Sequence, residues 1–561
     1  MPPQFILLMT LTAFSSLLGA ANNTEGTLIH PGPNGKLIYH ADKLGDVIPD
    51  FSSCGYMGGG AAIPDAIVRV TLASADAGDD GQRIQGALDQ VGHLPADGKG
   101  QCGAVLLQRG TWRVEGSLNI PSGVVLRGEG QGAEGTCIIA NGTSPRTVIN
   151  LSGASGARLM KETSQPILDE RVPIGTRYLR IAKPRAFHVG DAVVISRPGT
   201  EAWIHAIGMD KLPTQGDDRT QQWKASDYGL VFLRTVAEVD DHGITLDVPI
   251  VMALEKVFGG GEVAVCQPGA PCIQAGVERL RLVSTYSVGA EKSDELHASF
   301  GVAFGKAQDC WMREVTAEHF VMGCVSASGA ARRITIQDCA TLDPVSLITG
   351  GRRYSFFVAG QQVLVQRCYS RNGRHDYVTN AKTCGPNAFV DCLAEKCYAD
   401  CGPHQRWAVG ILYDNIVCKQ LNVQDRGSMG SGHGWAGANH VLWNCTAAIV
   451  CQQPPAAMNW AIGCTGSKGK AANARPEGVW VSWGKPVRTR SLYLQQLQDR
   501  LGASAVEAVA TPEQLKGSIT EVLRRRYKGQ PEYATRTAAT QKSAAPRTPL
   551  PKSPAAIPSP R

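Results

Sequence analysis

The sequence predicts an all-β protein folded as a right-handed parallel β-helix, a solenoid in which short strands stack rung upon rung. One observation is a series of short strand-like segments, such as AVLLQ (104–108) and VVLRG (124–128), separated by glycine-containing turns. Another is a unit of the later half, in which a strand is followed by a polar residue and a cysteine. These pairs are Asp309-Cys310, Asp338-Cys339, Arg367-Cys368, Asp391-Cys392 and Asn444-Cys445.

The spacing of these cysteines supports a repeated rung. Successive intervals are 29, 29, 24 and 53 residues, and the last is close to two of the shorter units. Stacked rungs would bring the pairs to one corner, with each cysteine facing inward and each polar residue in the turn. An ordinary β-sandwich is the alternative, but its strands need no polar residue and cysteine at a constant position.

Three regions flank or interrupt the predicted β-helix domain, which we place at residues 22–485. The segment 78–92 predicts a capping helix with Ile84, Leu88 and Val91 on one face. Residues 170–265 depart from the rung pattern and predict an insertion or rungs with long loops. Amphipathic segments at 491–502 and 511–529 predict a C-terminal helical cap over 486–530, packed on the solenoid.

The two ends of the chain have distinctive compositions. Residues 1–21 contain an apolar run that ends in small residues, which predicts a signal peptide and an extracellular or periplasmic protein, free of the membrane after cleavage. Residues 531–561 are rich in Pro, Ala and Thr and predict a disordered tail. From Thr535 onward the chain carries five positive charges and no acid, which leaves only +2 of the net charge of +7 for the rest, so the overall charge does not favour nucleic acid as a partner. We expect a monomer.

The chain contains seventeen cysteines, and export would allow some of them to form disulfides. Cys266 and Cys272 would close a short loop and are the best single candidate pair. The residues Cys392, Cys397, Cys401 and His404 fit no common zinc spacing, so we expect no zinc site there.

The segments GDDGQRIQGALDQV and GAVLLQRGTWRVEGSLNIPSGVVLRGEG, together with the cysteine-marked rungs, resemble the pectate-lyase-like superfamily. The resemblance covers roughly residues 45–460 and is specific for the fold. It implies a secreted protein that acts on an acidic polysaccharide, although the same fold carries lyases, hydrolases, epimerases and phage tailspikes. The triple-aspartate calcium pattern of pectate lyases is not found on successive rungs, which argues against pectate itself.

Counting from the corner cysteines places a candidate site in the C-terminal half. Asp376 and Asp400 each lie eight residues after a corner cysteine, so the two carboxylates should stack on neighbouring rungs. Convergent ionisable groups beside aromatic side chains are typical of a site for sugar acids. The other members of the predicted patch are Arg374, His375, Tyr377, His404, Arg406, Trp407, His433 and Trp435.

The chemistry of β-elimination suggests a role for each catalytic candidate. Arg374 or Arg406 would neutralise a uronate carboxylate, His375 or His404 would remove the C5 proton, and Tyr377 would protonate the leaving oxygen. Asp376 would orient a histidine or, with Asp400, hold Ca²⁺. Arg374, Asp400, Trp407, His433 and Trp435 would bind the substrate.

Two alternatives use the same patch differently. A glycoside hydrolase of the polygalacturonase kind would need a pair of carboxylates, from Asp376 and Asp400 with Asp414 as a third. A carbohydrate-binding protein without catalysis would need only the binding surface. A polysaccharide lyase is the first choice among the three.

Overall fold

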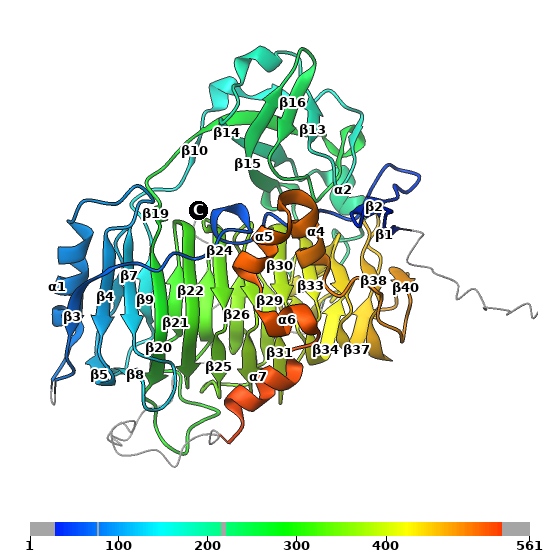
Figure 1. Cartoon of the computed structure of the whole chain (residues 1–561). Coiled ribbons are helices and arrows are strands. Elements are labelled where there is room, and N and C mark those ends of the chain that lie inside the picture. The colour runs from blue at the N-terminus through cyan, green and yellow to red at the C-terminus, as the bar shows by residue number, and fades with distance from the viewer. Residues whose placement is uncertain (1–27, 76–77, 215–219, 530–561) are drawn as a thin grey trace, which may run out of the picture.

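The computed structural model describes residues 28–75, 78–214 and 220–529. The predicted signal peptide and the predicted tail lie outside these residues. Strands stack in parallel from the helix α1 (Gly81–Gly92) at one end to β40 (Val479–Val481) at the other (Figure 1). Each full rung of the stack contributes strands to three faces.

Strands of the first face pair in parallel along the whole stack. They are β3 (Val68–Leu72), β4 (Gly103–Leu107), β7 (Val124–Gly128), β19 (Cys272–Ile273), β24 (Arg332–Gln337), β27 (Leu364–Gln366), β30 (Cys384–Val390), β33 (Ala408–Asp414), β35 (Gly437–Ala438), β36 (Val441–Trp443), β38 (Trp460–Ile462) and β40. The long strands β20 (Gly276–Ser284) and β22 (Ala307–Glu318) turn the corner and belong to the first and second faces.

The second and third faces are also built from parallel pairs. The second contains β5 (Gly110–Val114), β8 (Thr136–Ala140), β25 (Ala340–Leu342), β28 (Tyr369–Arg371), β31 (Leu393–Glu395), β34 (Val417–Val423), β37 (Thr446–Cys451) and β39 (Thr465–Lys468). The third contains β6 (Leu118–Asn119), β9 (Thr147–Leu151), β21 (Phe300–Phe304), β23 (Gly323–Ala327), β26 (Tyr354–Val358), β29 (His375–Thr379) and β32 (Gly402–Pro403). This pairing confirms the predicted parallel β-helix.

The corner between the first two faces has the predicted form. Its five polar residues have φ between 51° and 56°, the left-handed conformation that turns the chain. The cysteine after each of them is no more than 1% exposed and faces the core. Asn415 (φ 56°) and the buried Ile416 form the same corner without a cysteine, which accounts for the 53-residue interval.

Different elements close the two ends of the core. At the first end, α1 buries Ile84, Leu88 and Val91 against the first rungs, as its periodicity predicts. At the other end, Trp480 and Trp483 form a T-shaped pair and pack against the core.

The C-terminal helices run along the side of the stack and do not cap its end (Figure 1). They are α4 (Leu492–Leu501), α5 (Ala503–Val509), α6 (Pro512–Lys516) and α7 (Thr520–Tyr527). α4 packs on outward side chains of the first face, among them Leu412 and Trp443. α7 packs on Tyr369 and Leu393 of the second face. The helices therefore pack on the solenoid as predicted, but along its side and not as a cap on its end, because these faces expose apolar side chains that the helices cover.

An antiparallel sheet interrupts the stack and projects from its side (Figure 1). Its strands are β10 (Arg158–Leu159), β11 (Gln165–Pro166), β13 (Tyr178–Arg180), β14 (Ala192–Arg197), β15 (Leu230–Val239), β16 (Gly243–Leu246) and β18 (Glu262–Gln267), with the pair β12 (Arg171–Val172) and β17 (Leu254–Glu255) and the helix α2 (Glu201–Ala206) beside it. The rungs continue across this insertion, since β20 pairs directly with β7 and β8. An N-terminal hairpin of β1 (Ile29–Pro31) and β2 (Leu37–Tyr39) lies outside the stack.

None of the seventeen cysteines, all of which lie in the described residues, forms a disulfide, so the predicted Cys266–Cys272 disulfide is not formed. Cys266 lies in the inserted sheet, whereas Cys272 begins the next rung of the solenoid. Across the described residues, no helix has both the length and the apolar character needed to cross a bilayer.

Candidate functional site

The predicted patch lies on the third face, where β26, β29 and β32 are neighbours. Tyr354 pairs with His375, and Val378 pairs with Gly402. This register sets the backbone of Asp376 beside that of Asp400, as the spacing from the corner cysteines predicts.

The side chains of Asp376 and Tyr377 point into the solenoid, which corrects their predicted catalytic roles. Asp376 is fully buried and accepts hydrogen bonds from Ser355 (2.6 Å) and from Ser370 of the second face (2.5 Å). Burial raises the pKa of this carboxyl group, and the two serine hydroxyls oppose the rise. The Tyr377 hydroxyl lies 2.9 and 2.8 Å from the carbonyl oxygens of Cys368 and Leu393 inside the core. Neither group can reach a substrate outside the solenoid.

His375 and Asp400 form a hydrogen-bonded pair on the outer side of the third face. Nδ1 of His375 lies 2.7 Å from the carbonyl oxygen of Asp400 and 3.3 Å from its carboxylate. Both are acceptors, so the ring hydrogen belongs on Nδ1 and the lone pair on Nε2. His375 Nε2 has no hydrogen-bond partner within the described chain. A histidine held in this way can act as a base through Nε2.

Three histidines form a column across successive rungs. The ring of His404 lies 4.6 Å from that of His375 and 4.9 Å from that of His433, which follows the short helix α3 (Met429–Gly432). Burial, followed by repulsion from any positive charge on the neighbouring His375 ring and from Arg426, lowers the pKa of His404 well below its ordinary value. Burial, with Arg426 and Arg406, lowers the pKa of His433 to about 3. Both imidazoles are therefore neutral at physiological pH.

Tyr354 is a member of the site that sequence reasoning missed. Its hydroxyl lies within hydrogen-bond distance of Nε2 of His404 (2.9 Å), and burial raises the pKa of the phenol and keeps it protonated. The signal available in the sequence was its place at the start of the strand YSFFV, one rung before His375. We call Tyr354, His375, Asp400, His404 and His433 the histidine cluster.

Three guanidinium groups surround the histidine cluster. Arg426 lies 3.3 Å from the carboxylate of Asp400, and its charge helps to hold the pKa of that buried carboxyl group below the ordinary range, against the effect of burial. Arg374 is half-buried and donates to the carbonyl oxygen of Gly350. Arg406 donates to the carbonyl oxygen (2.9 Å) and hydroxyl (2.7 Å) of Ser431. The surroundings are cationic and suit an anionic ligand.

Arg353, which follows Arg352 and precedes Tyr354, lies at a corner of the solenoid with φ 57°. It is fully buried and donates to the carbonyl oxygens of Glu291, Ser346 and Asn372. It therefore supports the loops beside the histidine cluster.

Trp407 and Trp435 do not lie in the site, which corrects their predicted role as sugar platforms. Trp407 is fully buried and packs edge-on against Trp203 of the insertion, with ring centroids 5.0 Å apart. Trp435 is 1% exposed and donates to the carbonyl oxygen of Ile207. Both side chains hold the insertion on the solenoid, so the inserted sheet covers the faces that a sugar would need.

Access to the histidine cluster is narrow. His375 is 2% and His404 is 6% exposed, whereas Arg374, Arg406 and His433 are half-buried and face solvent. Several buried polar atoms here lack a hydrogen-bond partner among the described residues: His375 Nε2, His404 Nδ1, His433 Nδ1 and Arg426 Nε. Such atoms are costly to leave unpaired, and their concentration in one place is typical of a ligand site.

The carboxylates do not form a calcium site or a hydrolase pair. The prediction that the two carboxylates stack is wrong, because Asp376 faces the interior and Asp400 the exterior, and the two therefore do not converge on a common ion. Asp414 is buried beneath α4, where it accepts from Ser491 Oγ (2.6 Å) and the Tyr493 backbone (2.9 Å). Within the described residues, no group of three or more His, Cys, Asp or Glu side chains is placed to hold a metal ion.

Comparison with known proteins finds no matching family model and no matching curated protein. Solved structures that resemble the chain include the tailspike protein gp49 from Pseudomonas phage LKA1, with a TM-score of 0.43 and 12% identity over 69% of this chain and 57% of that one. The tailspike protein of E. coli bacteriophage HK620 in complex with pentasaccharide has a TM-score of 0.36 and 10% identity over 79% of this chain and 62% of that one. The chain thus spans about three fifths of the length of these tailspikes. Similarity at this level assigns no family, and the class of the protein, a parallel β-helix, rests on its strand pairing.

Proposed function

We propose that the protein is a secreted polysaccharide lyase that cleaves a uronic-acid-containing polysaccharide by β-elimination at the histidine cluster. The observation that carries this proposal is the His375–Asp400 pair, with Nε2 of His375 unpaired and three arginines around it. The polysaccharide class comes from the resemblance of the sequence to pectate-lyase-like proteins. The proposal that the protein is secreted rests on the apolar run at residues 5–21, which is typical of a signal peptide.

Substrate binding would begin with the uronate carboxylate. Arg374 and Arg406 are half-exposed cations on the open side of the cluster and would pair with this carboxylate. Neutralising its charge makes the C5 hydrogen more acidic, because the carbanion that forms is stabilised by the carboxyl group.

Elimination then needs one base and one acid. His375 Nε2 would take the C5 proton, and Asp400 would stabilise the resulting imidazolium. The electron pair of the C5–H bond forms the C4=C5 double bond as the C4–O bond breaks. Tyr354 would give its hydroxyl proton to the departing oxygen and would recover a proton through solvent from His375.

A binding protein without catalysis is the second candidate, and one observation favours it. His375 and His404 are covered almost completely, at 2% and 6% exposure, so a substrate would have to open the site. The hydrolase alternative has less support, since Asp376 and Asp414 are turned away from Asp400.

The proposal is tested with a panel of uronate polysaccharides, such as polygalacturonate, alginate and hyaluronan, by following the ultraviolet absorbance of an unsaturated product. We expect absorbance with at least one member of the panel and its loss in His375→Ala, with unchanged thermal unfolding. New reducing ends without absorbance would replace the lyase proposal with hydrolysis. Binding without either signal would leave the carbohydrate-binding candidate.

A further inference from the structure

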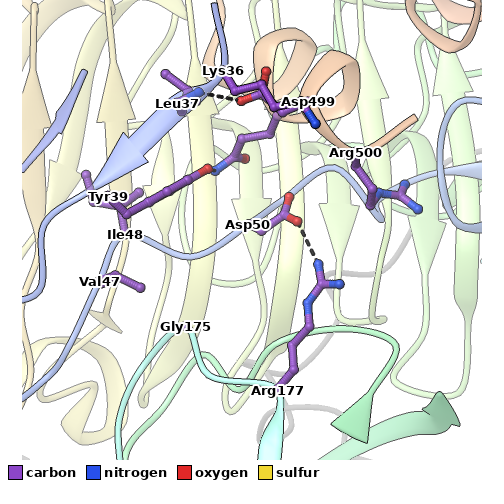
Figure 2. Close-up of a pocket in the computed structure, with 11 residues that line it drawn as sticks. Lys36, Leu37, Tyr39, Val47, Ile48, Asp50, Gly175, Arg177, Asp499 and Arg500 are labelled. Carbon is purple, nitrogen blue, oxygen red and sulfur yellow. Dashed lines mark hydrogen bonds and ion pairs between the residues drawn. The ribbon is translucent and has the colours of Figure 1, made fainter. Parts of the chain in front are cut away.

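A second site of a different kind lies where three distant parts of the chain meet. The N-terminal hairpin segment, the insertion near Gly175 and the helix α4 border an open hollow of about 350 Å³ (Figure 2). Ligand pockets typically start at about 300 Å³ and often lie between structural units. This hollow is separate from the histidine cluster, because its walls share no residue with the third face.

The walls of the hollow are held in place by hydrogen bonds between the three parts. Gln496 of α4 is 2% exposed and donates to the Tyr39 hydroxyl (3.0 Å) and the Pro49 carbonyl oxygen (2.9 Å). Arg177 of the insertion reaches Asp50, with 2.7 Å between Nη2 and Oδ2 (Figure 2). A ligand would therefore enter a preformed pocket and would not have to order it.

The acceptors that line the hollow are already engaged. Asp50 accepts from the Ser52 backbone through Oδ1 and from Arg177 through Oδ2. Asp499 accepts from the Leu37 backbone through Oδ2 and from Gln495 through Oδ1. The carboxylates thus serve to hold the walls together.

The hydrogen-bond donors that line the hollow, in contrast, still have N–H or O–H groups available for a ligand. Within the described chain, the Lys36 ammonium and the Tyr39 hydroxyl hydrogen have no acceptor, and Arg177 directs one of its N–H groups at Asp50. Ile48, Val47 and the ring of Tyr39 supply apolar wall. Spare donors, two of them cationic, beside an apolar wall match a compact ligand that carries an oxyanion.

We propose that this hollow binds a small molecule with a carboxylate or phosphate group, about the size of one sugar acid. Lys36, Arg177 and Tyr39 hold the oxyanion, and the body of the ligand lies against Ile48. Because the ligand contacts the N-terminal segment and the insertion at once, its binding stabilises the folded arrangement of these two parts. This inference does not depend on the proposed lyase activity.

Calorimetric titration of the full chain with D-glucuronate, inorganic phosphate and neutral glucose tests the proposal. We expect binding of at least one anion with a stoichiometry of one and an increase in the melting temperature, and no binding of glucose. Tighter binding of glucuronate than of phosphate would identify the ligand as a sugar acid. Tighter binding of phosphate would identify it as a phosphate ester. Failure of both anions to bind at millimolar concentration, or equal binding of glucose, would overturn the inference.

Variants locate the binding. Lys36→Met should weaken the binding of the anion by about 10-fold or more, since it removes a charge-assisted hydrogen bond. Tyr39→Phe should weaken this binding by a smaller factor. Lys43→Met removes an exposed lysine of the same segment that does not line the hollow, and should leave affinity unchanged. His375→Ala should also leave it unchanged, which separates this site from the histidine cluster. Equal losses in Lys36→Met and Lys43→Met would show non-specific charge attraction and refute the site.

Discussion

At the scale of single residues, the direction of each side chain decides its chemistry. Tyr354 lies on β26 and Tyr377 on the neighbouring strand β29. The Tyr354 side chain faces the histidine cluster, whereas the Tyr377 side chain faces the core. Simple alternation does not hold near this corner, because Ser355 and Phe356 are consecutive and both have inward contacts. The local sequence therefore could not say which tyrosine faces the histidine cluster.

The two tyrosines give a matched pair of predictions. Tyr354→Phe should lower the rate of elimination by about 100-fold, the usual contribution of a positioned acid, with an unchanged melting temperature. Tyr377→Phe should keep the activity and lower the free energy of unfolding by about 1–3 kcal/mol, because the buried hydrogen bond from its hydroxyl to the core carbonyl oxygens is lost. Steady-state rates and urea unfolding of both variants test this. Loss of activity in Tyr377→Phe, with activity retained in Tyr354→Phe, would instead place Tyr377 in the site.

At the scale of elements, the N-terminus of α4 rests on the buried carboxyl group of Asp414. Burial, followed by the nearby charge of Asp391, raises the pKa of Asp414 to about 7. Ser491 and the Tyr493 backbone donate to this carboxyl group. The docking of α4 is thus linked to the protonation of the Asp414 carboxyl group.

The pH dependence of stability follows from the direction of this shift. The folded protein holds the Asp414 proton more tightly than the unfolded chain, whose carboxyl has the ordinary pKa of 3.8. This contribution to stability is complete below about pH 4 and is lost as pH rises toward 7, at up to about 1.4 kcal/mol per pH unit. Asp414→Asn stays neutral, so its stability relative to wild type should rise between pH 5 and pH 8.

Urea unfolding of both proteins at several pH values measures this difference. Asp241→Asn, which changes an aspartate on the surface, is the control and should follow wild type. Parallel curves for wild type and Asp414→Asn would contradict the linkage.

The helix α7 supplies a second prediction at this scale. Leu523 is 1% exposed and packs among Leu342, Tyr369 and Leu393, whereas the neighbouring Val522 is 40% exposed. Leu523→Ala should lower the free energy of unfolding by about 2–4 kcal/mol, the usual range for a buried leucine. Val522→Ala should change it little, as measured by urea unfolding. Equal effects would mean that α7 is not docked on the second face.

At the scale of the whole molecule, the core is held by packing of thiols and apolar side chains, without disulfides. The corner cysteines lie inside, where burial raises the pKa of thiols such as Cys310 and Cys445 and keeps them unreactive. Cys137 and Cys418 are the half-exposed members of the set of seventeen.

Thiol titration tests this organisation. We expect seventeen reactive thiols per chain in denaturant without reductant, and rapid reaction of Cys137 and Cys418 before the others in the native protein. A lower number that rises to seventeen after reduction would show that disulfides form.

Prediction from the sequence succeeded where structure is local and repeated. A strand, a left-handed polar residue and an inward cysteine recur at short range, so their spacing revealed the corner and the register of Asp376 with Asp400. It failed for Trp407 and Trp435, which the insertion covers, and for Tyr354 and Arg426, which reach the site from other rungs.

The sequence by itself thus determined that the chain stacks into a solenoid and that residues 374–377 lie beside 400–404. The tertiary structure alone decided which of these side chains face outward and that the C-terminal helices lie along the side of the stack. It also decided that the hairpin segment, the insertion and α4 meet around an open hollow. The physical reason is that a rung repeats a local backbone pattern, whereas contacts between distant segments depend on the shape that each leaves for the other.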